Sequence, residues 1–169
     1  LIMTLILSRY LEDGINAFES DNYTKAYELL KTPAEQGVSV AQYKLGAMYY
    51  YGQGVNQDYQ EAIKWFKLAA QQGFAKAQYN LGVIYYNGQG INQDYQEAIK
   101  WYKLAALQGE IKAQSYLGDM YYNGLGIRQD YQEAFKWYKL AAEQGLANAQ
   151  NNLGNMYINA KGVNQDYQE

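Results

Sequence analysis

The side chains that could support catalysis are few in this sequence. The chain contains no Cys and no His, so it lacks disulfides, a thiolate nucleophile, the commonest metal ligand and the usual general base near neutral pH. None of its serines, Ser8, Ser20, Ser39 and Ser115, is followed three residues later by the Lys of a Ser-x-x-Lys nucleophile pair. We therefore expect a non-catalytic protein without a cofactor or a metal site.

Tyrosine and asparagine are the residues best suited to binding. The chain has 20 Tyr, and a Tyr ring offers rigid contact area with a polar tip, whereas an Asn amide can both donate to and accept from a peptide backbone. Whether these side chains can bind a partner depends on the helices or strands that hold them.

The composition is that of a folded domain. Of 169 residues, 49% are hydrophobic and 18% are charged, and the formal net charge is -3, so we expect a core but no polybasic face for nucleic acid. The apolar run from Leu1 to Leu7 is too short to span a membrane, and we interpret it as a signal-peptide remnant. Since the chain begins at Leu1, we expect a fragment, and the sequence leaves periplasmic, secreted and cytoplasmic locations open.

A period of 36 residues organises the chain. It connects Ala41, Ala77, Ala113 and Ala149; Gly46, Gly82, Gly118 and Gly154; and Trp65, Trp101 and Trp137. Such self-similarity is typical of a solenoid, in which stacked units bury their apolar faces against one another. The sequence predicts an atypical N-terminal capping unit at 1–37, full repeats at 38–73, 74–109 and 110–145, and a truncated repeat at 146–169.

Each repeat is predicted to begin with a first helix. In the first full repeat, Ala41, Leu45, Met48 and Tyr49 have helical spacing and form one apolar stripe. A glycine within this helix, Gly46, costs about 0.5–1 kcal/mol of helix propensity relative to Ala. Its recurrence predicts that a partner helix approaches closely at this point.

A second helix follows a glycine-containing loop. Asp58 with Glu61 predicts a capping box at the start of a helix over 59–72, and Gly73 is expected to end this helix. In the capping unit, Pro33 removes a helical hydrogen bond and is expected to kink or shorten the equivalent helix.

These motifs resemble a known repeat family. The segment Ala75–Lys103, AKAQYNLGVIYYNGQGINQDYQEAIKWYK, together with Leu68–Gly73, LAAQQG, is similar to the Sel1-like repeat, a relative of the tetratricopeptide repeat with a longer glycine-containing loop. The resemblance covers residues 38–169 and implies an all-α, right-handed α/α superhelix of antiparallel helix pairs. It also implies a protein-binding scaffold, because relatives occur as adaptors in signalling and in bacterial virulence.

The resemblance to tetratricopeptide repeats further implies that the first helices line a concave groove. Helical geometry selects four positions per repeat that the apolar stripe does not use, and most of these positions differ from repeat to repeat, as expected of recognition positions. They make the groove aromatic toward its N-terminal end and rich in Asn toward its C-terminal end. The predicted partner-binding residues are Tyr43, Tyr50, Tyr51, Tyr79, Val83, Tyr86, Asn87, Ser115, Asp119, Tyr122, Asn123, Asn151 and Asn155.

Structural roles compete with binding at several positions. Tyr49 and Tyr59 recur in register, so their series are interpreted as core. Asn87 and Asn123 follow the end of a helix, where an amide commonly caps the last carbonyl groups. Trp65 and its equivalents are expected to pack between neighbouring repeats.

Other functions remain open from the sequence. A carbohydrate or cell-wall-glycan binder would use Tyr faces to stack on sugar rings, and two such faces would flank a short pocket. A hydrolase of the β-lactamase type, described for some cysteine-rich relatives, would need a nucleophile that is missing here. Asp119 is the only acidic residue expected in the groove, and one carboxylate makes neither a glycosidase pair nor a metal site.

We expect instead that an extended segment of a partner protein lies across the first helices of successive repeats, anchored by tyrosines. No motif names this partner, and no insertion of the repeats into a membrane is expected. Replacing Tyr50 and Tyr86 by Ala should then abolish partner capture and leave the melting temperature nearly unaltered.

Overall fold

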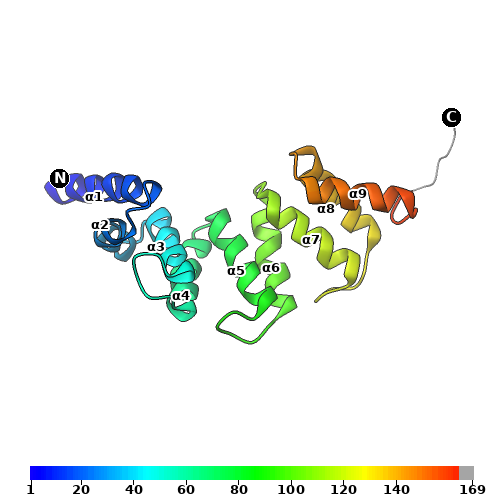
Figure 1. Ribbon diagram of the computed structural model, residues 1–169, viewed down its shortest axis with the longest axis horizontal. Coiled ribbons are helices and arrows are strands. Elements are labelled where there is room, and N and C mark those ends of the chain that lie inside the picture. Colours follow the sequence, from blue (N-terminus) through cyan, green and yellow to red (C-terminus); the bar gives the residue numbers. More distant parts are fainter. Residues whose placement is uncertain (164–169) are drawn as a thin grey trace. The chain divides into compact units, whose positions relative to one another are not determined.

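A computed structural model describes residues 1–163 (Figure 1). Within that range the chain forms nine α-helices and no strand. The helices are α1 (Ile2–Glu19), α2 (Tyr23–Glu35), α3 (Ser39–Tyr51), α4 (Tyr59–Gln71), α5 (Ala75–Asn87), α6 (Tyr95–Leu107), α7 (Ile111–Asn123), α8 (Tyr131–Glu143) and α9 (Ala147–Ile158). Two compact units, Leu1–Leu81 and Gly82–Glu169, divide the chain within α5.

The second helices begin at an Asp, as predicted. The Asp58 carboxylate accepts hydrogen bonds from the backbone N–H groups of Gln60 and Glu61, at 2.9 and 3.1 Å. The reciprocal half of the predicted capping box does not form, because the Asp58 N–H donates to the Tyr49 carbonyl at 2.9 Å. Glu61 pairs with Lys64 on the exposed face instead. The loop between the two helices is therefore tied back to the first helix.

Glycine allows the two helices of a repeat to approach, as the sequence predicts. A Cβ at Gly46 would lie 2.6 Å from the ring of Phe66, and a Cβ at Gly118 would lie 2.6 Å from the ring of Tyr138. No described atom lies within 4 Å of such a Cβ at Gly154. The prediction of close packing is confirmed at Gly46 and Gly118, whereas the helix predicted to approach Gly154 lies outside the described residues.

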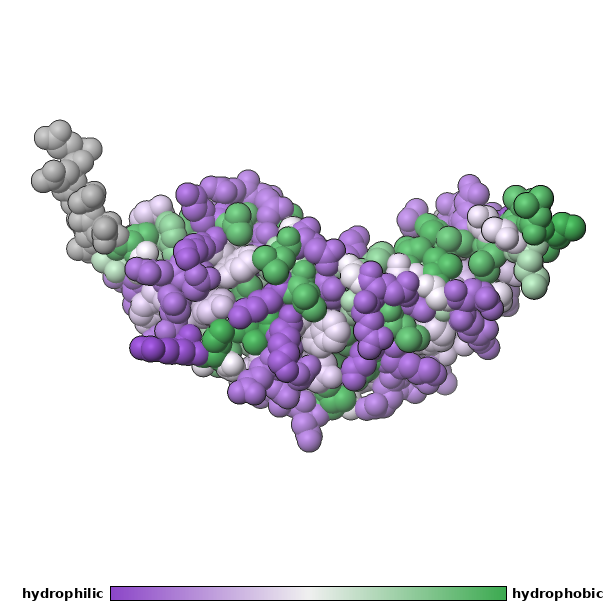
Figure 2. Space-filling model, turned by 180° about the vertical axis from the view of Figure 1, so that it is seen from behind, coloured by the Kyte–Doolittle hydropathy of each residue, from purple (hydrophilic) through white to green (hydrophobic). Residues whose placement is uncertain are grey.

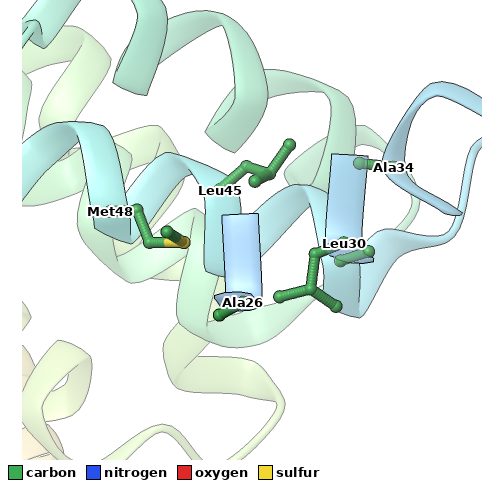
Figure 3. Close-up of a cluster of buried hydrophobic side chains, with 6 residues drawn as sticks. Ala26, Leu30, Ala34, Leu45 and Met48 are labelled. Carbon is green, nitrogen blue, oxygen red and sulfur yellow. The ribbon is translucent and has the colours of Figure 1, made fainter. Parts of the chain in front are cut away.

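The core of the N-terminal unit lies between α2 and α3 (Figure 3). Its buried members are Ala26, Leu30, Ala34, Ala41, Leu45 and Met48. Trp65 of α4 packs against this cluster, which confirms for this residue the predicted packing between neighbouring repeats. In the C-terminal unit, an equivalent cluster contains Ala134, Tyr138, Ala141, Ala142, Ala149 and Met156.

Buried glutamines join successive repeats. Gln42 in α3 donates from Nε2 to the Ala34 carbonyl near the C-terminal end of α2, at 3.1 Å, and its Oε1 accepts from Gln72 at 2.8 Å. In the C-terminal unit, Gln114 makes the same pair of bonds, with the Ala106 carbonyl and with Gln144. The bonds satisfy polar groups that a helix end leaves free, so the recurring Gln is a structural residue.

Two residues depart from the repeat pattern, but the backbone at both positions has the same conformation as in the other repeats. Pro33 lies within α2, which has 13 residues like α4, so the expected shortening of this helix does not occur. Ala160 stands where Gly52 and Gly124 stand in other repeats and adopts a left-handed φ of 50°. The loop at the end of α9 therefore keeps its turn despite the strain that a Cβ causes in this region of backbone space.

The surface is mostly polar, with apolar side chains exposed at the start of α1, where Leu1, Ile2 and Met3 lie (Figure 2). Of the helices described, none combines the length and the apolar character needed to cross a bilayer.

Candidate functional site

A polar pocket of about 230 Å³ opens among α7, α8 and α9 of the C-terminal unit. It is lined by Asp119, Tyr122, Asn123, Tyr138, Asn152 and Asn155. Four of these, Asp119, Tyr122, Asn123 and Asn155, are among the residues predicted from the sequence. The structure thus brings part of the predicted set together around one cavity, which we call the Asp119 pocket.

The Asp119 carboxylate is the only charged side chain that lines this pocket. Its Oδ1 accepts a hydrogen bond from the Tyr138 hydroxyl at 2.6 Å and another from the Asn152 amide at 3.3 Å. No described residue donates to its Oδ2. Burial raises the pKa of Asp119, and the hydrogen bond from Tyr138 opposes this rise.

Tyr138 lines the pocket although only 3% of its surface is exposed. Burial first, and then the hydrogen bond to Asp119, raise the pKa of its hydroxyl far above the usual range. The Tyr138 hydroxyl therefore remains a protonated donor to Asp119 under ordinary conditions.

Tyr122 lies at the rim and is held by a cation. The Lys161 ammonium donates to the Tyr122 hydroxyl at 2.9 Å and lies 4.9 Å from its ring centroid. It also lies 5.0 Å from the ring centroid of Tyr131. Lys161 forms no ion pair with Asp119, and the two tyrosines hold it at the edge of the pocket.

The two predicted asparagines at the pocket differ in their availability. Asn123 donates from Nδ2 to the backbone carbonyl of Asp119 at 2.9 Å, so it caps the end of its own helix, as one reading of the sequence expects. Asn155 is exposed, and its side chain makes no hydrogen bond with the described residues. The Asn155 amide can therefore bond to a ligand without breaking an internal bond.

The predicted tyrosines of α3 form an aromatic cluster in the N-terminal unit. The Tyr50 ring lies 4.8 Å from that of Tyr51 and 5.5 Å from that of Tyr59, between centroids. Both Tyr50 and Tyr43 also contact the buried ring of Phe66. Only Tyr51, which is 62% exposed, offers most of its surface to a partner.

The predicted residues of α5 lie on both sides of the unit boundary. Tyr79 is half-buried in the N-terminal unit. In the C-terminal unit, Val83 is half-buried and Asn87 is exposed, whereas the Tyr86 ring packs against the rings of Tyr95, Tyr102 and Tyr116. Burial is the main cause that raises the pKa of Tyr86.

This packing corrects one expectation. Tyr50 and Tyr86 are both half-buried and each contacts several rings within its own unit. Truncating either side chain to Ala removes these contacts, so a nearly unaltered melting temperature is no longer expected. A double Ala variant therefore does not separate binding from stability.

Two further predicted residues lie away from the pocket lining. Ser115 is buried, with 8% of its surface exposed, which leaves it little surface for a partner. Asn151 is exposed on α9 but does not line the pocket.

Asn152 and Tyr138 line the pocket but are not among the residues predicted from the sequence. Asn152 belongs to a series with Lys44, Asn80 and Tyr116, which varies as strongly as the positions that were selected. This variation between repeats could have identified Asn152 as a candidate binding residue. Tyr138 carries no such signal, because an aromatic residue stands at its position in every full repeat and only the contact with Asp119 sets it apart.

In the first full repeat, Lys44 is the residue that corresponds to Asn152. Its side chain is buried, with the ammonium 3.9 Å from the Glu19 carboxylate and 4.1 Å from the ring centroid of Phe18. Burial lowers the pKa of Lys44, and the charge of Glu19 opposes this effect. This position therefore contacts the preceding first helix in both units.

Comparison with sequence families gives one match, the Sel1 repeat, over residues 6–38, 39–74, 75–110, 111–146 and 147–169. No curated protein sequence matches the chain.

Solved structures of bacterial proteins resemble the chain. The protective antigen c5321 of uropathogenic Escherichia coli, which has an SLR fold, is 42% identical with a TM-score of 0.88, over 93% of this chain and 34% of that one. A Sel1 repeat protein from Oxalobacter formigenes is 39% identical with a TM-score of 0.87, over 92% of this chain and 64% of that one. The chain thus spans only part of both relatives.

A more distant neighbour shares the fold alone. The cysteine-rich protein B of Helicobacter pylori is 22% identical with a TM-score of 0.58, over 83% of this chain and 95% of that one. Together with the family match, these structures confirm the predicted α/α solenoid.

Proposed function

Because the chain belongs to the Sel1 repeat family, whose members are generally protein-interaction scaffolds and typically non-catalytic, we propose that it binds an extended segment of a partner protein. The segment lies on the first helices α7 and α9, and the Asp119 pocket receives one of its side chains.

The observation that carries this proposal is a difference between two sets of polar residues. Two glutamines that recur in the full repeats bond to backbone groups of the scaffold, since Gln42 donates to the Ala34 carbonyl and Gln57 to the Tyr50 carbonyl. Within the Asp119 pocket, Asp119 and Asn155 occupy the one register position whose residue differs in every repeat, Ala47, Val83, Asp119 and Asn155. Asn155 and Oδ2 of Asp119 remain without bonds to the described residues, as expected of groups that serve a ligand.

The chemistry of these groups suits a polypeptide. An amide side chain such as Asn155 can both donate to and accept from the backbone of an extended segment. Tyr122 adds aromatic surface at the rim of the pocket.

The geometry favours a peptide over a glycan. A sugar site of the kind considered above needs two aromatic faces on either side of a short pocket. Two tyrosines line the Asp119 pocket, but Tyr138 is 3% exposed and cannot stack on a sugar ring. Only Tyr122 is available for stacking.

A selection of displayed random peptides on the immobilised chain tests the proposal. The affinity of the selected peptides is then measured by fluorescence anisotropy for the wild type, for Asn155→Ala and for Asn148→Ala. Asn148 is the matched control, because it is an exposed Asn of the same helix outside the pocket lining.

We expect Asn155→Ala to weaken binding about three- to tenfold, as the loss of one hydrogen bond does, and Asn148→Ala to leave the affinity unchanged. If no peptide is enriched, or if both variants bind as the wild type does, the proposal is wrong.

A further inference from the structure

Asp119 is a half-buried carboxylate with no cation beside it. Among the described residues, no Lys or Arg nitrogen lies within 4.0 Å of its oxygens. Asp119 is half-buried, so the protein has removed part of the water from its carboxylate without supplying an opposite charge, and this burial raises its pKa. Such an arrangement disfavours the ionised form and destabilises the fold near neutral pH.

The scaffold does not require this carboxylate. At the position of Asp119, the first full repeat has Ala47, and Phe66 stands where Tyr138 stands. The second full repeat has Val83 at the same position. Because an apolar residue serves at this site in the first and second full repeats, and Asn155 stands there in the truncated repeat, the fold does not need a carboxylate at this position. This favours a use of Asp119 other than folding.

We infer that the Asp119 pocket accepts a positively charged side chain, Arg or Lys, from the partner segment. This inference rests on the proposed function and adds the class of side chain that the pocket selects. The incoming cation donates to Oδ2 of Asp119, and the amide oxygen of Asn155 provides a second acceptor. Charge-assisted hydrogen bonds of this kind are about twice as strong as neutral ones.

The size and charge of the pocket limit the other occupants. Its volume of about 230 Å³ is below the roughly 300–1,000 Å³ of sites that hold a whole small-molecule ligand, so it fits one side chain. A neutral side chain would remove more water from Asp119 without adding an opposite charge, and an acidic one would repel it. A cation supplies a hydrogen bond and an opposite charge together, and it therefore relieves the cost of burying this carboxylate more than a neutral donor does.

Lys161 bonds to a residue that lines the pocket, but it does not supply the missing charge. Its ammonium bonds to the Tyr122 hydroxyl and faces the rings of Tyr122 and Tyr131. It forms no ion pair with Asp119. The incoming cation therefore meets an unpaired carboxylate.

Blocked tripeptides of the form acetyl-Gly-X-Gly-amide test this inference, with X as Arg, Lys, Gln or Glu. They are titrated into the 15N-labelled chain, and binding is followed through the side-chain amide signals of Asn152 and Asn155. Two variants are titrated in parallel. Asp119→Asn keeps an acceptor for Tyr138 and removes the charge, whereas Glu143→Gln removes an exposed charge of α8 outside the pocket lining.

We expect the Arg or Lys tripeptide to bind at least tenfold more tightly than the Gln tripeptide. Asp119→Asn should abolish this preference without lowering the melting temperature, and Glu143→Gln should preserve it. The two basic arms show whether guanidinium or ammonium is preferred.

Equal binding of the Arg, Lys and Gln tripeptides, tighter binding of the Glu tripeptide, or a basic preference that survives Asp119→Asn would each overturn the inference. The absence of binding by all four tripeptides would overturn it as well. The proposed function would still stand in these cases if displayed peptides bind and depend on Asn155.

Discussion

The helix pairs α3–α4 and α7–α8 have the same scaffold and different surfaces. In both pairs a glycine of the first helix lies against an aromatic ring of the second, Gly46 against Phe66 and Gly118 against Tyr138. The residue that follows the glycine is the buried Ala47 in the first pair and Asp119 in the second. A carboxyl group and a hydroxyl group, added together at neighbouring sites, therefore turn an apolar contact into a polar pocket.

This difference separates the requirements of folding from those of binding. The scaffold needs a small gap at the glycine, a ring that fills it, and the recurring Gln and Asp side chains that satisfy backbone groups. Beside the glycine it accommodates residues as different as Ala47, Val83, Asp119 and Asn155. Repeats can therefore change their binding chemistry at such positions while their fold is retained.

The largest effect is expected at the shared glycines. Gly46→Ala and Gly118→Ala each place a Cβ 2.6 Å from a packed ring and should lower the free energy of unfolding by about 1–3 kcal/mol. Urea denaturation followed by circular dichroism measures this change. Gly154→Ala is the control, and since its Cβ meets no described atom within 4 Å, it should be neutral or stabilise by up to about 1 kcal/mol. Equal effects at all three sites would contradict a common scaffold.

The next effect concerns the pair Asp119 and Tyr138. Asp119→Ala leaves the buried Tyr138 hydroxyl without its carboxylate acceptor and should cost about 1–2 kcal/mol of stability. Adding Tyr138→Phe recreates the Ala47 and Phe66 pair of the first full repeat and should recover at least half of the loss. Urea denaturation of both single variants and the double variant gives the coupling between the residues. Additive effects would show that the hydrogen bond does not link them.

A smaller effect is expected where α9 ends. Ala160 has a φ of 50°, in the region that Gly52 and Gly124 occupy in their repeats, so Ala160→Gly should raise the free energy of unfolding by about 0.5–1 kcal/mol. Lys161→Gly is a suitable comparison in the same loop, because its backbone needs no positive φ. A loss of stability in Ala160→Gly would show that the strain at this position is negligible.

The smallest effect is a dependence of stability on pH. Burial raises the pKa of Asp119 in the folded state, so this residue favours folding at low pH and loses that contribution as pH rises through its folded pKa. Asp119→Asn should therefore melt about 1–2 °C above the wild type at neutral pH. The difference should shrink as pH falls and Asp119 becomes protonated. Thermal melts over a range of pH test this, and a difference that is constant with pH would rule out titration of Asp119 as its source.

The fold could be predicted from the sequence because each structural residue recurs every 36 positions, so its role can be inferred from several repeats at once. The apolar stripe of the first helix, the glycine contacts and the Asp caps could be predicted from local spacing alone, because every repeat packs its two helices in the same way. The capping box was half wrong, because the Asp58 N–H bonds to Tyr49 across the loop, and spacing within one helix does not show such a contact.

The site was harder to predict for a related reason. Variation among repeats identified Asp119 and Asn155, which line the pocket, but it also selected Ser115, which is buried. Tyr138 was missed because its role comes from Asp119, a residue on another helix. Contacts between helices depend on how the helices cross, and one sequence without a structure does not give that crossing.

In this chain, binding is proposed to depend on the pocket residues that differ between repeats, and folding on the residues that recur. The most direct test is the affinity of a display-selected peptide for Asp119→Ala/Tyr138→Phe, measured beside the unfolding free energy of the same variant. We expect the affinity to fall at least tenfold while the free energy of unfolding stays within about 1 kcal/mol of that of the wild type. Unchanged affinity in this stable variant would contradict this proposal.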